Sequence, residues 1–455
     1  MAQQNLAEVV ENDRYYTIYI CVRFGVRLSA ILTFLKGRKM ARGMDSIGLF
    51  DGLLFPKIFQ TFRMAIQPTK LIIAFLAVAI ICLAGWLMDF SGTVVTDESG
   101  NVTELSQFMH PNGPIESHIA KFKDSGKRKG VFSTLWHFGS DKFHKALREL
   151  FDFNFTSVGD NISDCFRALT WAFRYHYIYC LIFVTIVLAV MSVAGGALCR
   201  IAALQFAQGE RPGLTESLRF SIGRFTSFFT APLAPIGIIA FMGFFIFLLG
   251  LFGNIPRAGE LIVGLGMPWV LLLGSLTAVI AVGAVVGFGL MFPAVAYDGS
   301  DCFDSISRSF SYVYAQPARM AFYTVIAAVY GAICYIVIRF FVFLMLWITH
   351  CFVRLGIWTD VSTEGVNKLT AIWPRPEWMN LLGFSDPVTA NWTELWASRL
   401  VYFFVLVVIG LMVSFIISFY FCANTVIYSL MRNRVDKTAL DDICTHFEEA
   451  EADVS

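Results

Sequence analysis

Charged residues are scarce in this chain, and acidic ones are absent from its most apolar stretches. Asp, Glu, Lys and Arg make up 15% of the 455 residues and leave a formal net charge of +1, whereas soluble domains contain about 25% charged residues. A nucleic-acid-binding protein needs a concentrated basic surface, so this composition argues against a nucleic-acid partner. No carboxylate interrupts any of six long apolar runs. Ion-coupled carriers generally keep such a carboxylate in the membrane, so that class loses support.

Sequence signatures of catalysis and metal binding are also missing. The ten cysteines include no CxxC pair, which argues against a disulfide framework and a zinc site. The chain contains no HExxH motif, no GxSxG nucleophile elbow and no Walker A loop. We therefore expect no catalytic residue, no metal and no cofactor, in a protein that is not an enzyme. The N-terminus lacks the features of a signal peptide, so the first transmembrane helix is expected to direct insertion.

Apolar sequence is what the chain has in abundance, since 56% of its residues are hydrophobic. The longest uncharged run covers residues 261–297, and about 20 apolar residues suffice to cross the hydrocarbon core of a bilayer. Pro268 and Pro293 are each expected to kink or end the helix, because proline lacks a backbone N–H donor. We therefore predict that this helix crosses the membrane over residues 270–291.

Two glycines in this run are spaced for close helix packing. Gly283 and Gly287 form a small-xxx-small pair, which lets a neighbouring helix approach closely. Packing inside one subunit is the expected role, and a dimer face is the alternative.

The apolar runs and the loops between them predict an all-α integral membrane protein with about six transmembrane helices. The predicted parts are a cytoplasmic or interfacial N-terminal region (1–70), a first transmembrane helix (71–88), a large extracytoplasmic insertion (89–174), a four-helix membrane core (175–349), a Trp-rich extracytoplasmic loop (350–398), a last transmembrane helix (399–431) and an acidic cytoplasmic tail (432–455). Lys and Arg are enriched in the short segments on the N-terminal side of the bilayer. The positive-inside rule therefore places both termini in the cytoplasm.

Three segments that precede predicted spans have the pattern of amphipathic helices. The clearest, residues 301–319, places four apolar residues on one helical face before a Gln-Pro pair: Phe303, Ile306, Phe310 and Val313. Arg308 and Ser309 are expected on the opposite, solvated face. Residues 53–70 repeat this order and residues 214–225 resemble it. Each is predicted to be an interfacial elbow helix that turns through proline into the bilayer, because the residue before proline avoids helical geometry.

Residues 15–35 allow two interpretations. Apolar and polar residues alternate from Tyr16 to Ser29, and a period of two is typical of a β-strand. No partner strand is evident and the apolar run continues, so an interfacial helix is the competing prediction.

Two stretches carry a resemblance to a known class of membrane proteins. Residues 195–222 read GGALCRIAALQFAQGERPGLTESLRFSI, and residues 292–323 read FPAVAYDGSDCFDSISRSFSYVYAQPARMAFY. Both resemble segments of uncharacterised six-helix bacterial integral membrane proteins, which are loosely similar to the membrane domain of some glycerophosphodiester phosphodiesterases. The resemblance implies the fold and a bacterial inner (cytoplasmic) membrane, and it transfers no catalytic residue.

Arg339 is the one basic residue deep in a predicted span. It follows 19 uncharged residues, 320–338. If the helix enters the membrane at Met320, Arg339 reaches the outer interface and extends its side chain to water. If the helix enters later, Arg339 lies deeper and could bind an anion or a lipid head group. Packing against a backbone carbonyl is the third possibility.

A histidine-containing face in the insertion has the spacing of metal ligands. His137, Asp141 and His144 fall at i, i+4 and i+7 of a predicted helix. Lys142 and Lys145 lie on the same helix and oppose a bound cation. We therefore expect a solvated face rather than a metal site.

Two functions remain compatible with the sequence. The first is a non-enzymatic scaffold or subunit of a membrane assembly, in contact with the lipid bilayer and other membrane protein subunits. The large insertion and the Trp-rich loop, above spans almost without charge, favour it. The alternative is a transporter or channel-like carrier for an apolar or lipid-like solute, because proline-broken spans can line a cavity.

Overall fold

A computed structural model describes most of the chain, namely residues 55–97, 103–109, 115–122, 127–152, 154–256, 258–357, 367–378, 380–381 and 391–444. The segment 15–35, with its two competing predictions, lies outside these residues. The C-terminal tail is described only as far as Cys444.

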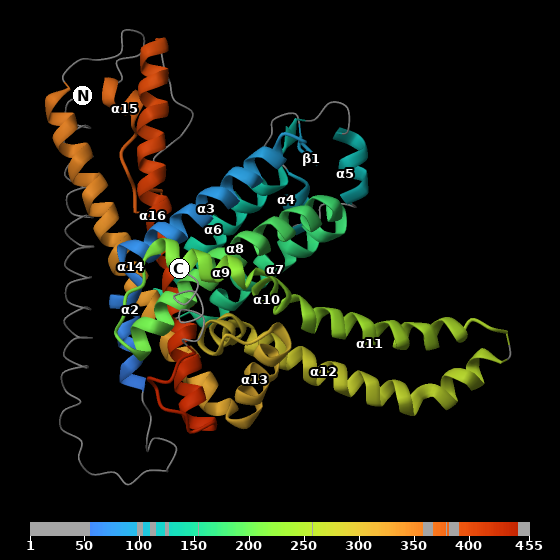
Figure 1. The fold of residues 1–455 in the computed structure, drawn as a ribbon. Helices are drawn as coiled ribbons and strands as arrows, with labels where there is room; N and C mark the ends of the chain where they lie inside the picture. Colours follow the sequence, from blue (N-terminus) through green and yellow to red (C-terminus); the bar gives the residue numbers. More distant parts are fainter. Residues whose placement is uncertain are drawn as a thin grey trace. The chain divides into compact units, whose positions relative to one another are not determined.

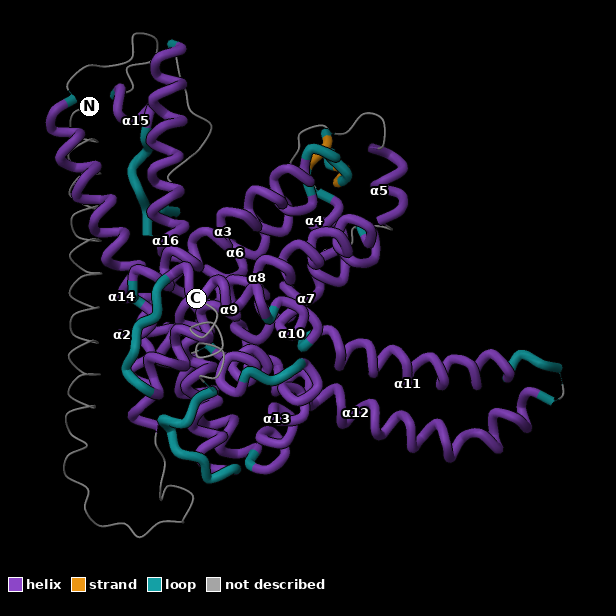
Figure 2. The backbone as a smooth tube through the Cα atoms, viewed as in Figure 1, coloured by secondary structure: helices purple, strands orange, loops and turns teal. Residues whose placement is uncertain are grey.

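Six of the described helices are long and apolar enough to cross a membrane, which confirms the predicted all-α membrane fold (Figure 1). They are α3 (Pro68–Asp89), α8 (Tyr177–Ala207), α11 (Leu233–Phe252), α12 (Gly259–Asp298), α14 (Pro317–Gly356) and α16 (Trp392–Val435). The shorter elements are η2 (Phe55–Phe59), α2 (Gln60–Ala65), α4 (Glu104–Met109), α5 (Ile115–Phe122), α6 (Val131–Phe151), α7 (Phe155–Tyr175), α9 (Leu214–Gly223), α10 (Phe225–Thr230), α13 (Cys302–Ala315) and α15 (Lys368–Ile372), together with strands β1 (Val94–Val95) and β2 (Arg128–Lys129). Figure 2 shows how completely helix dominates the described backbone.

Of the two effects expected from the prolines, a kink or an end of the helix, α12 shows no end at either proline. It continues for 40 residues through Pro268 and Pro293, about 60 Å at 1.5 Å per residue. A proline removes only one hydrogen bond of the helix, and neighbouring helices can accommodate that loss in a membrane protein. The helix ends instead at Gly299, whose φ of 61° gives the left-handed conformation typical of a helix terminus.

The predicted proline corners are present at two spans. α3 begins at Pro68 and α14 begins at Pro317, each with a glutamine as its N-cap. The fixed φ of proline suits the first position of a helix, where no backbone donor is needed. The short elements α2 and α13 precede these corners, so the predicted order of short helix, proline and long apolar helix is confirmed.

The buried face of α13 differs from the predicted stripe. Phe303 is 66% exposed, whereas Ser309 is fully buried. Ile306 and Val313 are buried as expected. The buried face of α13 includes Ser309 because its small side chain lies against Gly287 of α12. A larger side chain would prevent this close contact.

Four spans meet in a tightly packed core at the ends that the sequence places near the cytoplasm. Its members come from α3, α8, α12 and α16, with one phenylalanine from α10: Ile73, Ala74, Ala77, Ala194, Ala197, Leu198, Cys199, Ile201, Phe228, Phe292, Val295, Ala296 and Phe421. Gly195 and Gly196 of α8 lie within it, and a Cβ at Gly195 would be 2.5 Å from the Phe421 ring. Small residues therefore bring these helix backbones together.

The predicted insertion 89–174 is largely helical in its described part. α6 and α7 pack against each other, and α6 also contacts α3. Asp89, the last residue of α3, accepts hydrogen bonds from the backbone N–H groups of Phe132 and Ser133 at 2.9 and 2.8 Å. A carboxylate at this position satisfies donors that the start of a helix leaves unpaired, so the insertion is attached directly to the end of a span.

Candidate functional site

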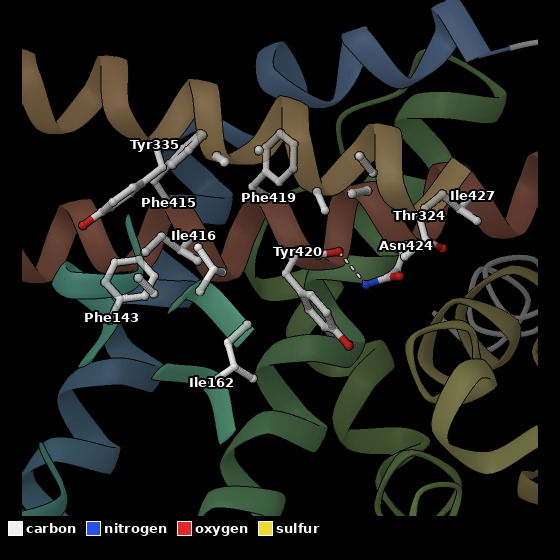
Figure 3. Close-up of a pocket in the computed structure, with 17 residues that line it drawn as sticks. Phe143, Ile162, Thr324, Tyr335, Phe415, Ile416, Phe419, Tyr420, Asn424 and Ile427 are labelled. Atoms are coloured by element: carbon white, nitrogen blue, oxygen red, sulfur yellow. Dashed lines mark hydrogen bonds between the residues drawn. The ribbon is translucent and has the colours of Figure 1, made fainter. Parts of the chain in front are cut away.

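An apolar groove of about 490 Å³ lies between two spans and the helices of the insertion (Figure 3). Its walls come from α14 and α16 on one side and from α6 and α7 on the other: Phe143, Ala146, Val158, Ile162, Thr324, Ala327, Ala328, Gly331, Ala332, Tyr335, Phe415, Ile416, Phe419, Tyr420, Ala423, Asn424 and Ile427. Its volume is in the range of about 300–1,000 Å³ that is usual for sites of small ligands.

The groove exists because α14 presents small side chains where α16 presents large ones. Ala327 and Ala328 lie one turn before Gly331 on α14, and all three line the groove. A Cβ at Gly331 would be 2.6 Å from the ring of Phe419, so glycine is required for that ring to approach. The small side chains of α14 leave the space, the aromatic rings of α16 lie beside them, and α6 and α7 form the opposite wall.

Polar groups are few and, apart from the Tyr420 hydroxyl, lie at the two ends of the groove. Figure 3 shows Tyr335 and Phe143 at one end, and Thr324, Asn424 and Ile427 at the other. The Thr324 hydroxyl donates to the carbonyl of Met320 at 2.9 Å. The Asn424 amide donates to the carbonyl of Tyr420 at 2.9 Å. Both donors are satisfied within their own helices, so the interior offers mainly apolar contact.

Arg339 lies one helical turn beyond Tyr335, next to one end of the groove. Its Nη1 donates to the Tyr335 hydroxyl at 3.0 Å and lies 2.8 Å from Nε2 of His144. Its Nη2 donates to the carbonyl oxygen of Trp378 at 2.7 Å, and the Trp378 ring lies 5.2 Å from the guanidinium. The arginine therefore joins α14 to α6 and to the segment that follows α15.

The environment of Arg339 agrees with one of the three sequence-based alternatives. Its side chain is 2% exposed, so it does not extend to water, and it packs against a backbone carbonyl. Within the described part of the chain no carboxylate pairs with it, and its Nε has no hydrogen-bond acceptor. An arginine remains charged in proteins, and leaving a buried charge uncompensated costs about 3–5 kcal/mol. Arg339 is thus a buried charge beside the groove with no carboxylate partner among the described residues.

The three residues with metal-ligand spacing are divided between two places. His144 faces Arg339, whereas His137 and Asp141 line a separate polar pocket between α4 and α6. Among the described residues no group of three or more His, Cys, Asp and Glu side chains could hold a metal ion. Burial and the neighbouring Arg339 guanidinium lower the pKa of His144 below its usual range, which favours the neutral ring that can accept a hydrogen bond.

Gly283 and Gly287 lie where α12 packs against α13. A Cβ at Gly283 would be 3.0 Å from the Tyr314 hydroxyl, and one at Gly287 would be 3.6 Å from Cβ of Ser309. The Tyr314 hydroxyl also donates to the carbonyl of Val279 on α12. Both glycines therefore take part in a contact within the chain.

Lys70 and Arg200 are further buried cations that were not singled out by sequence. Lys70 is fully buried and donates to the carbonyl of Met64 at 3.2 Å and to Oε1 of Gln205 at 2.8 Å. Arg200 is 2% exposed and donates to the carbonyls of Ala296 and Cys444 at 3.1 and 3.0 Å. In the sequence both are simply basic residues at the ends of spans, a position at which a basic side chain normally extends to water.

No protein family, curated protein or solved structure matches this chain. The geometry of the groove and of Arg339 is therefore the basis for a functional proposal.

Proposed function

We propose that this chain is a non-enzymatic carrier in a bacterial cytoplasmic membrane that binds a lipid-like solute in the groove between α14, α16, α6 and α7. The observation that supports this function is the apolar groove of about 490 Å³, whose few polar groups lie mainly at its ends. Of the two functions compatible with the sequence, the groove favours the carrier.

The length of the groove suits one hydrocarbon chain. On α14 it extends from Thr324 to Tyr335, which is about 16 Å along a helix at 1.5 Å per residue. One leaflet contributes about half of a hydrocarbon core of roughly 30 Å, so a lipid chain of one leaflet spans a similar length. In the groove a lipid chain would contact apolar side chains, and in the bilayer it contacts other lipid tails. Because both surroundings are apolar, binding depends on how well the chain fits the shape of the groove.

A variant that fills the groove tests this function. Ala328 lines the groove, and Ala328→Trp should displace a bound chain. Val329 is the next residue on α14, is 55% exposed and is not part of the groove wall, so Val329→Trp is the matched control. We expect lipid retained after purification, and lipid transfer between vesicles, to fall in the first variant alone. Equal retention and transfer in both variants would rule out the groove as the binding site.

A role as a subunit of a membrane assembly is the second candidate, and the α11–α12 hairpin favours it. These two helices pack on each other, and Pro235 is the only buried residue of α11. In α12, Gly259 is the only buried residue before Gly283. Such a hairpin leaves long apolar faces for lipid or for another membrane helix.

Photo-crosslinking from the hairpin distinguishes lipid from protein at these faces. A crosslinking residue in place of Leu271, which is 66% exposed, should give one adduct of defined mass in intact cells. The same residue in place of the buried Val295 is the control. Lipid adducts alone at Leu271 would argue against a protein partner there.

A further inference from the structure

We propose that the lipid bound in the groove is acidic and that its negatively charged head group binds Arg339. This inference rests on the proposed function, because it assigns the chemical class of the ligand in the same groove.

Some residues that line the groove either contact Arg339 or are adjacent in sequence to a residue that does. Tyr335 lines the groove, and its hydroxyl accepts a hydrogen bond from Arg339. On the opposite wall Phe143 lines the groove, and the adjacent residue His144 contacts Arg339. A chain that ends near Tyr335 and Phe143 therefore places its head group beside the guanidinium.

The partners of Arg339 within the described residues are all neutral. They are an imidazole nitrogen, a tyrosine hydroxyl and a backbone carbonyl. A guanidinium has five N–H donors, and three of them are used in these contacts. The donor on Nε has no acceptor, and one donor on Nη2 is also left over. A carboxylate or phosphate binds two such donors at once and supplies the missing negative charge.

The lipid, rather than a free anion, is favoured by what surrounds the arginine. The Arg339 side chain is 2% exposed, and the apolar groove leads to its neighbours Tyr335 and Phe143. A small anion gains nothing from the groove, whereas a lipid gains its chain contacts and a charge-assisted bond together. His144 is the contact that a head group can replace, because it is a neutral acceptor on the insertion rather than part of the α14–α16 wall.

The test compares two ligands that share one chain length and differ in charge. Palmitate and hexadecanol are titrated against the full chain in detergent, with native mass spectrometry as the readout, at a pH at which the carboxylate is ionised. We expect palmitate to bind about tenfold or more tightly, because a hydrogen bond to a charged group is the stronger one. Equal affinity of the wild-type protein for both ligands would overturn the proposal whatever any variant does.

Variants then assign the preference to Arg339. Arg339→Gln should bring the palmitate-to-hexadecanol ratio close to one while hexadecanol binding persists, which also reports that the variant is folded. Arg339→Lys should retain part of the preference. A ratio that is unchanged in Arg339→Gln would overturn the assignment, as would displacement of palmitate by inorganic phosphate at equal concentration, which indicates a site for free anions. Failure of both lipids to bind the wild-type protein would instead overturn the proposed function itself.

Discussion

The carboxylate of Asp298 lies 3.2 Å from Nε of Arg432, so the last residue of α12 is ion-paired with the last turn of α16. Arg308 of α13 approaches the same carboxylate at 3.3 Å, and the Tyr428 hydroxyl donates to it. The side chains of Asp298 and Arg432 are 7% and 10% exposed. One buried carboxylate therefore holds three helices together at the end of the bundle.

Removal of this carboxylate should destabilise the protein. Asp298→Asn keeps the shape of the side chain but leaves two arginines without their shared anion, and breaking a buried ion pair costs about 3–5 kcal/mol. Asp304→Asn is the control, because Asp304 also pairs with Arg308 but is 44% exposed, and exposed pairs are worth about 0–1 kcal/mol. Thermal unfolding in detergent measures both. A loss of the same size in the two variants would show that the ion pairs of Asp298 stabilise the protein no more than the exposed ion pair of Asp304 does.

Close packing of the core should make Gly196 sensitive to a single methyl group. A Cβ there would be 2.3 Å from Oγ of Ser221 and 2.7 Å from the ring of Phe228, and overpacking costs about 1–3 kcal/mol. A Cβ at Gly274 of α12 meets nothing within 4 Å. Gly274→Ala should therefore be neutral or stabilising by about 0.5–1 kcal/mol, and Gly196→Ala should lower the unfolding temperature. Equal behaviour of the two alanine variants would contradict the packing described here.

The elements that sequence predicted well are those fixed by local chemistry. Six helices follow from apolar length, and the corners at Pro68 and Pro317 follow from the geometry of the residue before proline. The end of α12 does not follow from its prolines, because proline acts on one turn only and Gly299 provides the terminus. Each of these features depends on residues that are close together in the sequence.

The candidate site could not be predicted in the same way because it depends on contacts across the chain. The groove combines side chains from α6 with side chains more than 170 residues later on α14 and α16. Arg339 was identified because a charge in an apolar run is unusual, but its contact with His144 spans 195 residues. Periodicity likewise failed on α13, where Ser309 is buried by the neighbouring Gly287 rather than by its own hydrophobicity.

That revised face of α13 predicts an unusual order of mutational sensitivity. Ser309 is fully buried and its hydroxyl donates to the carbonyl of Ser305 at 2.7 Å, so Ser309→Asp places a charge where it has no solvent. Phe303→Asp changes a side chain that is 66% exposed. We expect Ser309→Asp to reduce yield and detergent stability strongly and Phe303→Asp to have the smaller effect. The reverse order would restore the apolar stripe as the buried face.

The orientation of the chain in the membrane is open to direct labelling. The positive-inside rule places both termini in the cytoplasm, and the spans then put Gln208 and Ser300 inside and Asn380 outside. Single cysteines at these positions, in a background without the ten native ones, report the side by reaction with an impermeant thiol reagent in intact cells. We expect labelling at Asn380 alone. Strong labelling at Gln208 would reverse the topology or change the number of spans.

The contact between His144 and Arg339 should make stability depend on pH. His144 must be neutral to accept from Nη1 of Arg339, and burial, followed by the charge of Arg339, lowers its pKa in the folded state, while Asp141 acts in the opposite direction. The unfolded chain, with a histidine pKa near about 6.5, therefore binds the proton first as pH falls. Stability is full above that value and declines below it.

His144→Gln should remove this part of the decline, because the glutamine carbonyl accepts from Arg339 at any pH. His137→Gln, at an exposed histidine on the same helix α6, should leave the decline as it is in the wild-type protein. Unfolding temperatures measured from neutral to mildly acidic pH give the three profiles. Since one lowered pKa changes the proton balance by at most one per chain, the difference between the His144→Gln and wild-type profiles cannot exceed about 1.4 kcal/mol for each pH unit. Parallel profiles for all three proteins would mean that His144 titrates alike in the folded and unfolded chain, and that its contact with Arg339 does not hold it neutral.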